Sequence, residues 1–116
     1  MSIKRIKSGE RMSQAVVHGG IVQTAGQVAQ NAKGESVAKQ TEDILNEIDS
    51  LLSQAGTDKT KLLSATIWLS NIDDFAEMNG VWDAWVSPGN APTRACVESK
   101  LAAPHFTVEI AVSAVA

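Results

Sequence analysis

Alternating apolar and polar residues mark five short stretches of this chain as β-strands. Residues 14–18 and 21–25 lie on either side of Gly19-Gly20, a pair that favours a two-residue hairpin turn. The segment 61–70 alternates between Leu, Ala or Ile and Ser, Thr or Trp. Residues 93–99 and 106–114 complete the set. The pattern therefore predicts an N-terminal hairpin and three further strands.

Two other stretches repeat their apolar residues at helical spacing. The first runs from about residue 36 to residue 55 and is followed by Gly56, a suitable C-terminal cap. The second runs from about residue 73 to residue 86, with Asn71 or Asp73 as its N-terminal cap. The predicted inner stripes are Val37, Thr41, Ile44, Leu45, Ile48, Leu51, Leu52 and Ala55 in the first helix, and Phe75, Met78, Trp82 and Trp85 in the second.

The order of these elements, β-β-α-β-α-β-β, predicts the fold class. Two amphipathic helices must bury their apolar stripes on one face of a mixed sheet, which gives a two-layer α/β sandwich of the α+β kind. A further short strand is expected at residues 3–6. Because the chain contains no linker, repeat or low-complexity tract, residues 1–116 are predicted to form a single domain.

Strand alternation divides the sheet residues between two faces. The face toward the helices is predicted to carry Leu63, Ile67, Ala95, Val97, Val108, Ile110 and Val112, and the other face Trp68, Arg94, Cys96, Glu98, Glu109 and Ala111. A face that mixes tryptophan, cysteine and alanine with charges is too apolar to be left bare. We therefore expect another subunit to cover it.

Composition narrows the classes of function. Hydrophobic residues make up 44% and charged residues 20%, so a folded globular domain is expected. The net charge of −3 argues against a general binder of the nucleic-acid backbone. A lone cysteine fits a reducing compartment, and neither a secretory leader nor a bilayer-spanning apolar run is visible. We expect a cytoplasmic protein without nucleic-acid or membrane partners.

Arg94, Cys96 and Glu109 are the residues best suited to chemistry. Period two places Arg94 and Cys96 on one side of their strand and predicts Glu109 on the like side of the next. Such an arginine could bind a carboxylate through two parallel hydrogen bonds, while the glutamate orients or deprotonates a water. The alternative, which spacing alone favours, is a structural Arg94–Glu109 ion pair that ties two strands together.

Other chemistries have weaker support. Cys96 would need an adjacent base to act as a nucleophile, and neither His18 nor His105 is placed by the sequence to serve. These isolated histidines predict exposed turns or strand ends and no metal site. Neither glycine-rich phosphate-binding motif occurs. Residue patterns alone therefore predict an oligomeric α/β domain with a candidate anion pocket.

Several blocks of the sequence resemble the RidA (YjgF) family. "APTRACVESKLAAPHFTVEIAVSA" is similar to that family's C-terminal signature, P-x-R-x-x-V followed by L, P and V-E-I. "SQAVVHGG" and "TAGQ" resemble its N-terminal blocks, and "DDFAEMNGVWDAW" its second helix. The blocks occur in the family's order over nearly the whole chain. The resemblance implies a chorismate-mutase-like fold and a homotrimer with clefts between adjacent subunits.

The resemblance also implies a reaction. Archetypal members hydrolyse reactive 2-imino and enamine acids to 2-keto acids and ammonia, without a metal or organic cofactor. By this resemblance Arg94 binds the substrate carboxylate, backbone groups of Cys96 contact the imine end, and Glu109 positions the attacking water. The interval from Arg94 to Glu109, 109 − 94 = 15, is that of the family.

Two positions differ from the archetypal pattern. Met12 stands where such members have a tyrosine, and Ala25 where they have a serine that lines the pocket. Both changes remove a hydroxyl group, which predicts a less polar cleft.

The residues and the resemblance together leave two candidate functions. One is an imine/enamine deaminase, and the other is a non-catalytic protein that binds a small carboxylic acid in the same pocket. A ribonuclease role, also attached to the family, is disfavoured by the pI near 5.3 and the lack of paired histidines.

Overall fold

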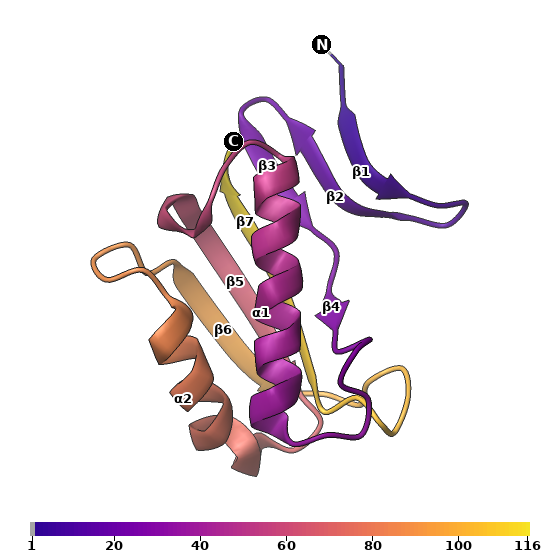
Figure 1. The fold of residues 1–116 in the computed structure, drawn as a ribbon, viewed down its shortest axis with the longest axis vertical. Coiled ribbons are helices and arrows are strands. Elements are labelled where there is room, and N and C mark those ends of the chain that lie inside the picture. The colour runs from indigo at the N-terminus through magenta and orange to yellow at the C-terminus, as the bar shows by residue number, and fades with distance from the viewer. Residues whose placement is uncertain (1) are drawn as a thin grey trace.

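The computed structural model describes residues 2–116 and has two layers, a mixed sheet and two helices that cover one face of it (Figure 1). The helices are α1 (Val37–Gln54) and α2 (Phe75–Trp85). The strands are β1 (Lys4–Ser8), β2 (Ser13–His18), β3 (Ile21–Thr24), β4 (Gln27–Val28), β5 (Leu62–Leu69), β6 (Thr93–Glu98) and β7 (Val108–Val115). The predicted fold class and the additional N-terminal strand are confirmed, and the short β4 is new.

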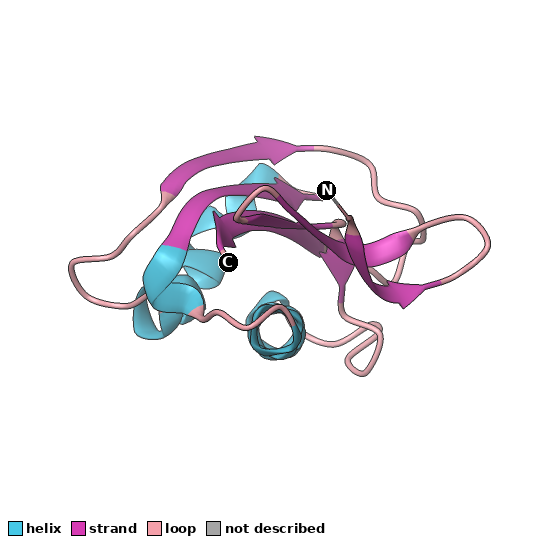
Figure 2. Ribbon diagram, turned by 90° about the horizontal axis from the view of Figure 1, so that it is seen from above, coloured by secondary structure: helices cyan, strands magenta, loops and turns pink. Residues whose placement is uncertain are grey.

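The sheet has the strand order β1-β2-β3-β7-β5-β6, and all neighbouring strands are antiparallel except β5 and β6. β3 pairs with residues 113–115 of β7, and β4 pairs with residues 109–110 of the same strand. The chain therefore interrupts its pairing with β7 at Ala25-Gly26. Figure 2 shows both helices on the same side of the sheet, which leaves the opposite face, called here the open face, uncovered.

The first helix follows its predicted pattern closely. Ser36 caps its N-terminus by accepting a hydrogen bond from the Lys39 N–H, and Gly56 follows its C-terminus with a φ of +82°. The predicted inner stripe is buried except for the half-buried Ala55. Gln40 is buried as well, because its amide bonds the chain near the start of β7 through the His105 carbonyl and the Thr107 N–H.

The second helix departs from its predicted stripe at one end. Met78 and Trp82 are buried and Trp85 is half-buried, as the stripe predicts. The prediction for Phe75 is wrong, because its side chain is 40% exposed. Its ring lies 5.6 Å from the guanidinium carbon of Arg94 instead of in the core.

The assignment of β6 to the two faces of the sheet is also wrong. β6 runs parallel to β5 in a register that pairs Arg94 with Ala65, Cys96 with Ile67 and Glu98 with Leu69. Those three β5 partners are buried under the helices, so Arg94, Cys96 and Glu98 lie on the helix side. Ala95 and Val97 lie on the open face, beside Thr66 and Trp68. Because both faces carry apolar residues, alternation within β6 does not show which side turns inward.

Leu63 is a further exception, and its cause is a β-bulge. Leu62 pairs with Ala114 and Ser64 with the adjacent Ser113, so Leu63 is an extra residue on β5. Its side chain is 43% exposed, whereas Leu62 is buried in its place. The remaining predictions for the helix side, Ile67, Val108, Ile110 and Val112, are confirmed.

Candidate functional site

Arg94 lies on the helix side of β6, against α2. Its Nη1 donates a 2.7 Å hydrogen bond to Oδ1 of Asn79. The guanidinium carbon lies 5.4 Å from the centre of the Trp82 ring and 5.6 Å from that of Phe75. Such distances allow cation–π attraction. The side chain is half-buried and forms no ion pair within residues 2–116, so its charge is available to an anion.

Cys96 lies two residues further along β6 on the same side as Arg94. It is half-buried and packs against the hydrophobic core. Burial raises the pKa of the Cys96 thiol, and the charge of Arg94 opposes this only in part. A thiol with a raised pKa stays protonated at neutral pH and is a poor nucleophile.

Glu109 lies on the open face of β7, between Trp68 of β5 and Val28 of β4. Burial raises the pKa of its carboxyl group above the ordinary glutamate value. The backbone of Gly26 approaches the same carboxylate so closely that an added Cβ would overlap it, with the Glu109 Cδ 2.8 Å away. The interruption between β3 and β4 therefore makes room for this carboxylate.

Glu109 lines a pocket of about 510 Å³ beside β4. Met12 and Gln14 come from the β1–β2 hairpin, and Asp43 and Glu47 come from α1. Gln27, Gln30 and Asn31 add further polar groups. The loss of two hydroxyl groups at Met12 and Ala25 therefore does not make the whole pocket apolar, since amides and carboxylates supply much of its wall.

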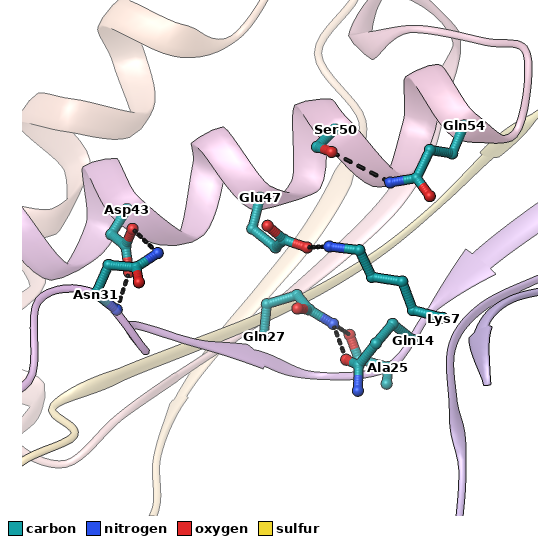
Figure 3. A network of polar contacts seen from close by, with 9 residues as sticks. All are labelled: Lys7, Gln14, Ala25, Gln27, Asn31, Asp43, Glu47, Ser50 and Gln54. Carbon is teal, nitrogen blue, oxygen red and sulfur yellow. Dashed lines mark hydrogen bonds and ion pairs between the residues drawn. The ribbon is translucent and has the colours of Figure 1, made fainter. Parts of the chain in front are cut away.

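Figure 3 shows how the pocket wall is held together. Lys7 of β1 forms a 2.6 Å ion pair with Glu47 of α1. The Asn31 N–H donates to Asp43 Oδ2 at 3.0 Å. Nε2 of the buried Gln27 donates to Gln14 Oε1 and to the Ala25 carbonyl. These contacts tie the β1–β2 hairpin, the Ala25-Gly26 interruption and α1 to one another.

The sequence-predicted site is thus divided within one chain. Arg94 and Cys96, the anchor half-site, lie on the helix side of the edge strand β6. Glu109 and Met12 line the pocket beside β4, and Ala25 adjoins it; these three form the water half-site. β5 separates β6 from β7. The expectation that Arg94 and Glu109 share one face is wrong, and with it the alternative of an Arg94–Glu109 ion pair within the chain.

Sequence reasoning missed three residues that support these groups. Asn79 is not marked by any sequence pattern, because a polar residue beside an apolar helical stripe does not stand out. Its only signal is its spacing, four residues after Phe75 and three before Trp82. Gly26 and Gln27 belong to the quoted "TAGQ" block, but no residue pattern links them to Glu109. Only the pairing of β4 with β7 brings them together.

Other chemistries gain no support from the described part of the chain. His18 and His105 are exposed and lie at opposite ends of β7, since His18 pairs with Ile21 beside Val115 and His105 precedes Val108. Within residues 2–116, no three His, Cys, Asp or Glu side chains are grouped to hold a metal ion.

No helix among residues 2–116 is long and apolar enough to cross a bilayer. A larger hollow of about 680 Å³ along residues 98–106 contains neither Arg94 nor Glu109.

Comparisons with known proteins cover nearly the full length of the chain. The family described as endoribonuclease L-PSP matches residues 2–116. A RutC family protein of Haemophilus ducreyi is 43% identical over 112 residues, which are 97% of this chain and 95% of that protein. The 2-iminobutanoate/2-iminopropanoate deaminase of Escherichia coli is 31% identical over 108 residues, with 88% of this chain and 84% of the deaminase covered.

Solved structures agree in fold. The crystal structure of NMB1025, a member of the YjgF protein family from Neisseria meningitidis, superimposes with a TM-score of 0.95 at 45% identity. That match covers 99% of this chain and 95% of the other. With sequence blocks, sheet topology and full-length similarity in agreement, the chain belongs to the RidA (YjgF) family.

Proposed function

We propose that this protein hydrolyses reactive 2-imino and enamine acids to 2-keto acids and ammonia, in clefts between the subunits of a homotrimer. The observation that carries the proposal is the preorganised guanidinium of Arg94, which forms no ion pair within residues 2–116 and matches a carboxylate. A second support is the Glu109 carboxyl, whose pKa is raised by burial. Support also comes from the relative named as an iminobutanoate/iminopropanoate deaminase.

The chemistry needs few groups. Arg94 binds the substrate carboxylate, backbone groups of Cys96 contact the imine nitrogen, and Glu109 holds a water against the imine carbon. The water oxygen forms a bond to that carbon while Glu109 accepts one of its protons. Glu109 returns this proton to the nitrogen, which gives a carbinolamine that carries a hydroxyl and an amino group. The hydroxyl proton then moves to the nitrogen, with Glu109 as the relay, while the carbon–nitrogen bond breaks, so ammonia leaves and the carbon–oxygen bond becomes that of the ketone. An imine is already electrophilic, so orientation supplies much of the effect and no cofactor takes part.

The division of the site within one chain favours assembly. Arg94 and Glu109 can meet a single small substrate only if one subunit supplies the anchor half-site and its neighbour the water half-site. The open face, where Trp68 is half-buried and Val97 is 45% exposed, supplies apolar surface for such contacts. A cyclic trimer would repeat this heterologous pairing three times and close. We place the assembly in the cytoplasm.

Mixed oligomers test the sharing of the site. We expect Arg94→Ala and Glu109→Gln homotrimers to be nearly inactive, and oligomers reassembled from an equal mixture of the two to recover activity. If subunits mix at random, each cleft has about one chance in four of receiving an intact half-site from both sides. About a quarter of the parent activity should therefore return.

Light scattering before and after mixing shows whether the oligomers have formed again. Each variant dissociated and reassembled with itself shows how much activity the procedure alone changes. Recovery of no activity from well-mixed trimers would place both half-sites in one subunit. A monomer at micromolar concentration would contradict the shared cleft itself.

Gly26 offers a test of where Glu109 must lie. Gly26→Ala should displace the Glu109 carboxylate, because the new methyl group would occupy its place. A displacement of about 1 Å can lower kcat/KM by about a hundredfold. The melting temperature should change little, since the displaced group is the end of a flexible side chain. The matched control is Gly80→Ala on α2, where nothing lies within 4 Å of the added Cβ. Equal kcat/KM in both variants would contradict the role of this approach.

A non-catalytic carboxylate-binding protein is the second candidate, favoured by the absence of a hydroxyl group at Met12 and Ala25. A coupled assay separates the two. An amino-acid oxidase generates the imine, semicarbazide traps it, and the purified protein is added at substoichiometric amounts. A deaminase lowers the amount of trapped imine catalytically, whereas a binder lowers it only in proportion to its concentration. The second outcome would refute the proposed reaction.

A further inference from the structure

One stripe of α2 surrounds the Arg94 guanidinium. Phe75, Asn79 and Trp82 follow one another at intervals of four and three residues, so they share one side of the helix. The two rings lie 5.6 and 5.4 Å from the guanidinium carbon, and Asn79 Oδ1 accepts from Nη1 at 2.7 Å. Three contacts from a rigid helix therefore restrain a side chain that is otherwise flexible.

The contacts leave one edge of the guanidinium free. Nη1, the nitrogen on the side of Cδ, is taken by Asn79. Within residues 2–116, Arg94 makes no other side-chain hydrogen bond, so Nε and Nη2 remain free to donate. These two nitrogens form the side-on fork that binds both oxygens of a carboxylate.

The partner on Nη1 is also neutral. Glu98 lies on the same side of β6, yet its carboxylate accepts from the Ile72 N–H at 3.0 Å and forms no ion pair with Arg94. An amide restrains the guanidinium without neutralising it. A carboxylate at position 79 would restrain it equally well but would compete with any bound anion.

We propose that Asn79 is the positioning residue of Arg94, which orients the Nε–Nη2 edge toward a 2-keto or 2-imino carboxylate while leaving its positive charge unpaired. The inference rests on the proposed function in that it takes Arg94 as the carboxylate anchor. Asn79 itself does not touch the substrate.

Two substitutions at position 79 separate positioning from a structural role. The probe is 2-ketobutyrate, measured by isothermal titration calorimetry with the full-length oligomer. Asn79→Ala should raise the Kd about tenfold, equivalent to about 1.4 kcal/mol, because the freed guanidinium loses its orientation. In the deaminase assay KM should rise while kcat at saturation changes little.

Asn79→Asp should raise the Kd further, by about a hundredfold, because the new carboxylate takes the charge that the ligand needs. Its melting temperature should equal or exceed that of the parent, since an ion pair replaces a neutral contact. A purely structural contact predicts the reverse, with binding retained in Asn79→Asp. Asn46→Ala and Asn46→Asp, at an exposed position of α1, are the matched controls.

The free edge can be observed directly. In ¹⁵N NMR spectra the Nε–H signal of Arg94, identified by its loss in Arg94→Lys, should shift when 2-ketobutyrate is added to the parent protein. An unmoved signal at saturation would overturn the assignment of the edge. Binding by Asn79→Asp as tight as the parent's would overturn the positioning role, and the deaminase function would stand if turnover persists. A parent that binds no 2-keto acid would overturn both.

Discussion

Arg94→Lys is expected to weaken binding of 2-keto acids strongly while the protein still folds and assembles. Lysine keeps the charge but presents no planar fork, and it cannot bond Asn79 and a carboxylate with fixed geometry. Loss of one charge-assisted hydrogen bond costs about 1.5–3 kcal/mol of binding free energy. This corresponds to an increase in Kd of about 10- to 150-fold.

Calorimetric titration with 2-ketobutyrate measures this effect, and Arg5→Lys provides the matched control at an exposed position of β1. Thermal unfolding should show little change in either variant, because Arg94 makes no ion pair among the described residues that the substitution could break. If Arg94→Lys binds 2-ketobutyrate as tightly as the parent does, Arg94 is not the carboxylate anchor.

The elements of the fold could be predicted because their signals are local. The inner stripe of α1 and the glycine that follows it mark the helix without reference to the rest of the chain. The hairpin at Gly19-Gly20 is equally local, since both glycines adopt positive φ angles of 60° and 77°. Helices, hairpin and fold class are therefore confirmed, and the one strand missed among residues 2–116, β4, is only two residues long.

The faces of the sheet could not be predicted in the same way. Period two shows that Arg94 and Cys96 lie on one side of β6, but the side itself depends on the register with β5. When one face of a sheet is exposed to solvent, its polar residues show which face it is. In β6, small and apolar residues occur on both faces. Polarity predicts that the more apolar pair, Ala95 and Val97, faces inward, whereas the helices cover Arg94 and Cys96.

Identifying the site residues required the family resemblance, and placing them in space required the fold. The family signature identifies Arg94 and Glu109, and strand alternation predicts that they share one face of the sheet. The structure instead places β5 between their strands and turns them to opposite faces. Alternation within each strand cannot show whether two strands turn the same way, because that depends on their register with the strands beside them.

Glu109→Gln is expected to stop turnover while leaving 2-keto acid binding nearly intact. Glutamine can hold a water but cannot accept its proton, and general-base catalysis contributes about 10²- to 10⁴-fold. In the parent, kcat/KM should rise with pH as Glu109 loses its proton. Because burial raises the pKa of this carboxyl, the rise should occur above the ordinary range of a glutamate.

The same substitution should change how stability depends on pH. Between the ordinary pKa of a glutamate and the raised pKa of Glu109, the folded protein binds more protons than the unfolded chain, so the free energy of unfolding falls as pH rises through this window. Glu109→Gln removes that fall, and at neutral pH the variant should melt at an equal or higher temperature than the parent.

Glu42→Gln, exposed on α1, is the control for removing one negative charge. Thermal unfolding of the three proteins from pH 4 to pH 8 makes the comparison. A neutral-pH melting temperature lowered by Glu109→Gln would show that the carboxylate stabilises the fold, and full turnover by that variant would exclude Glu109 as the base.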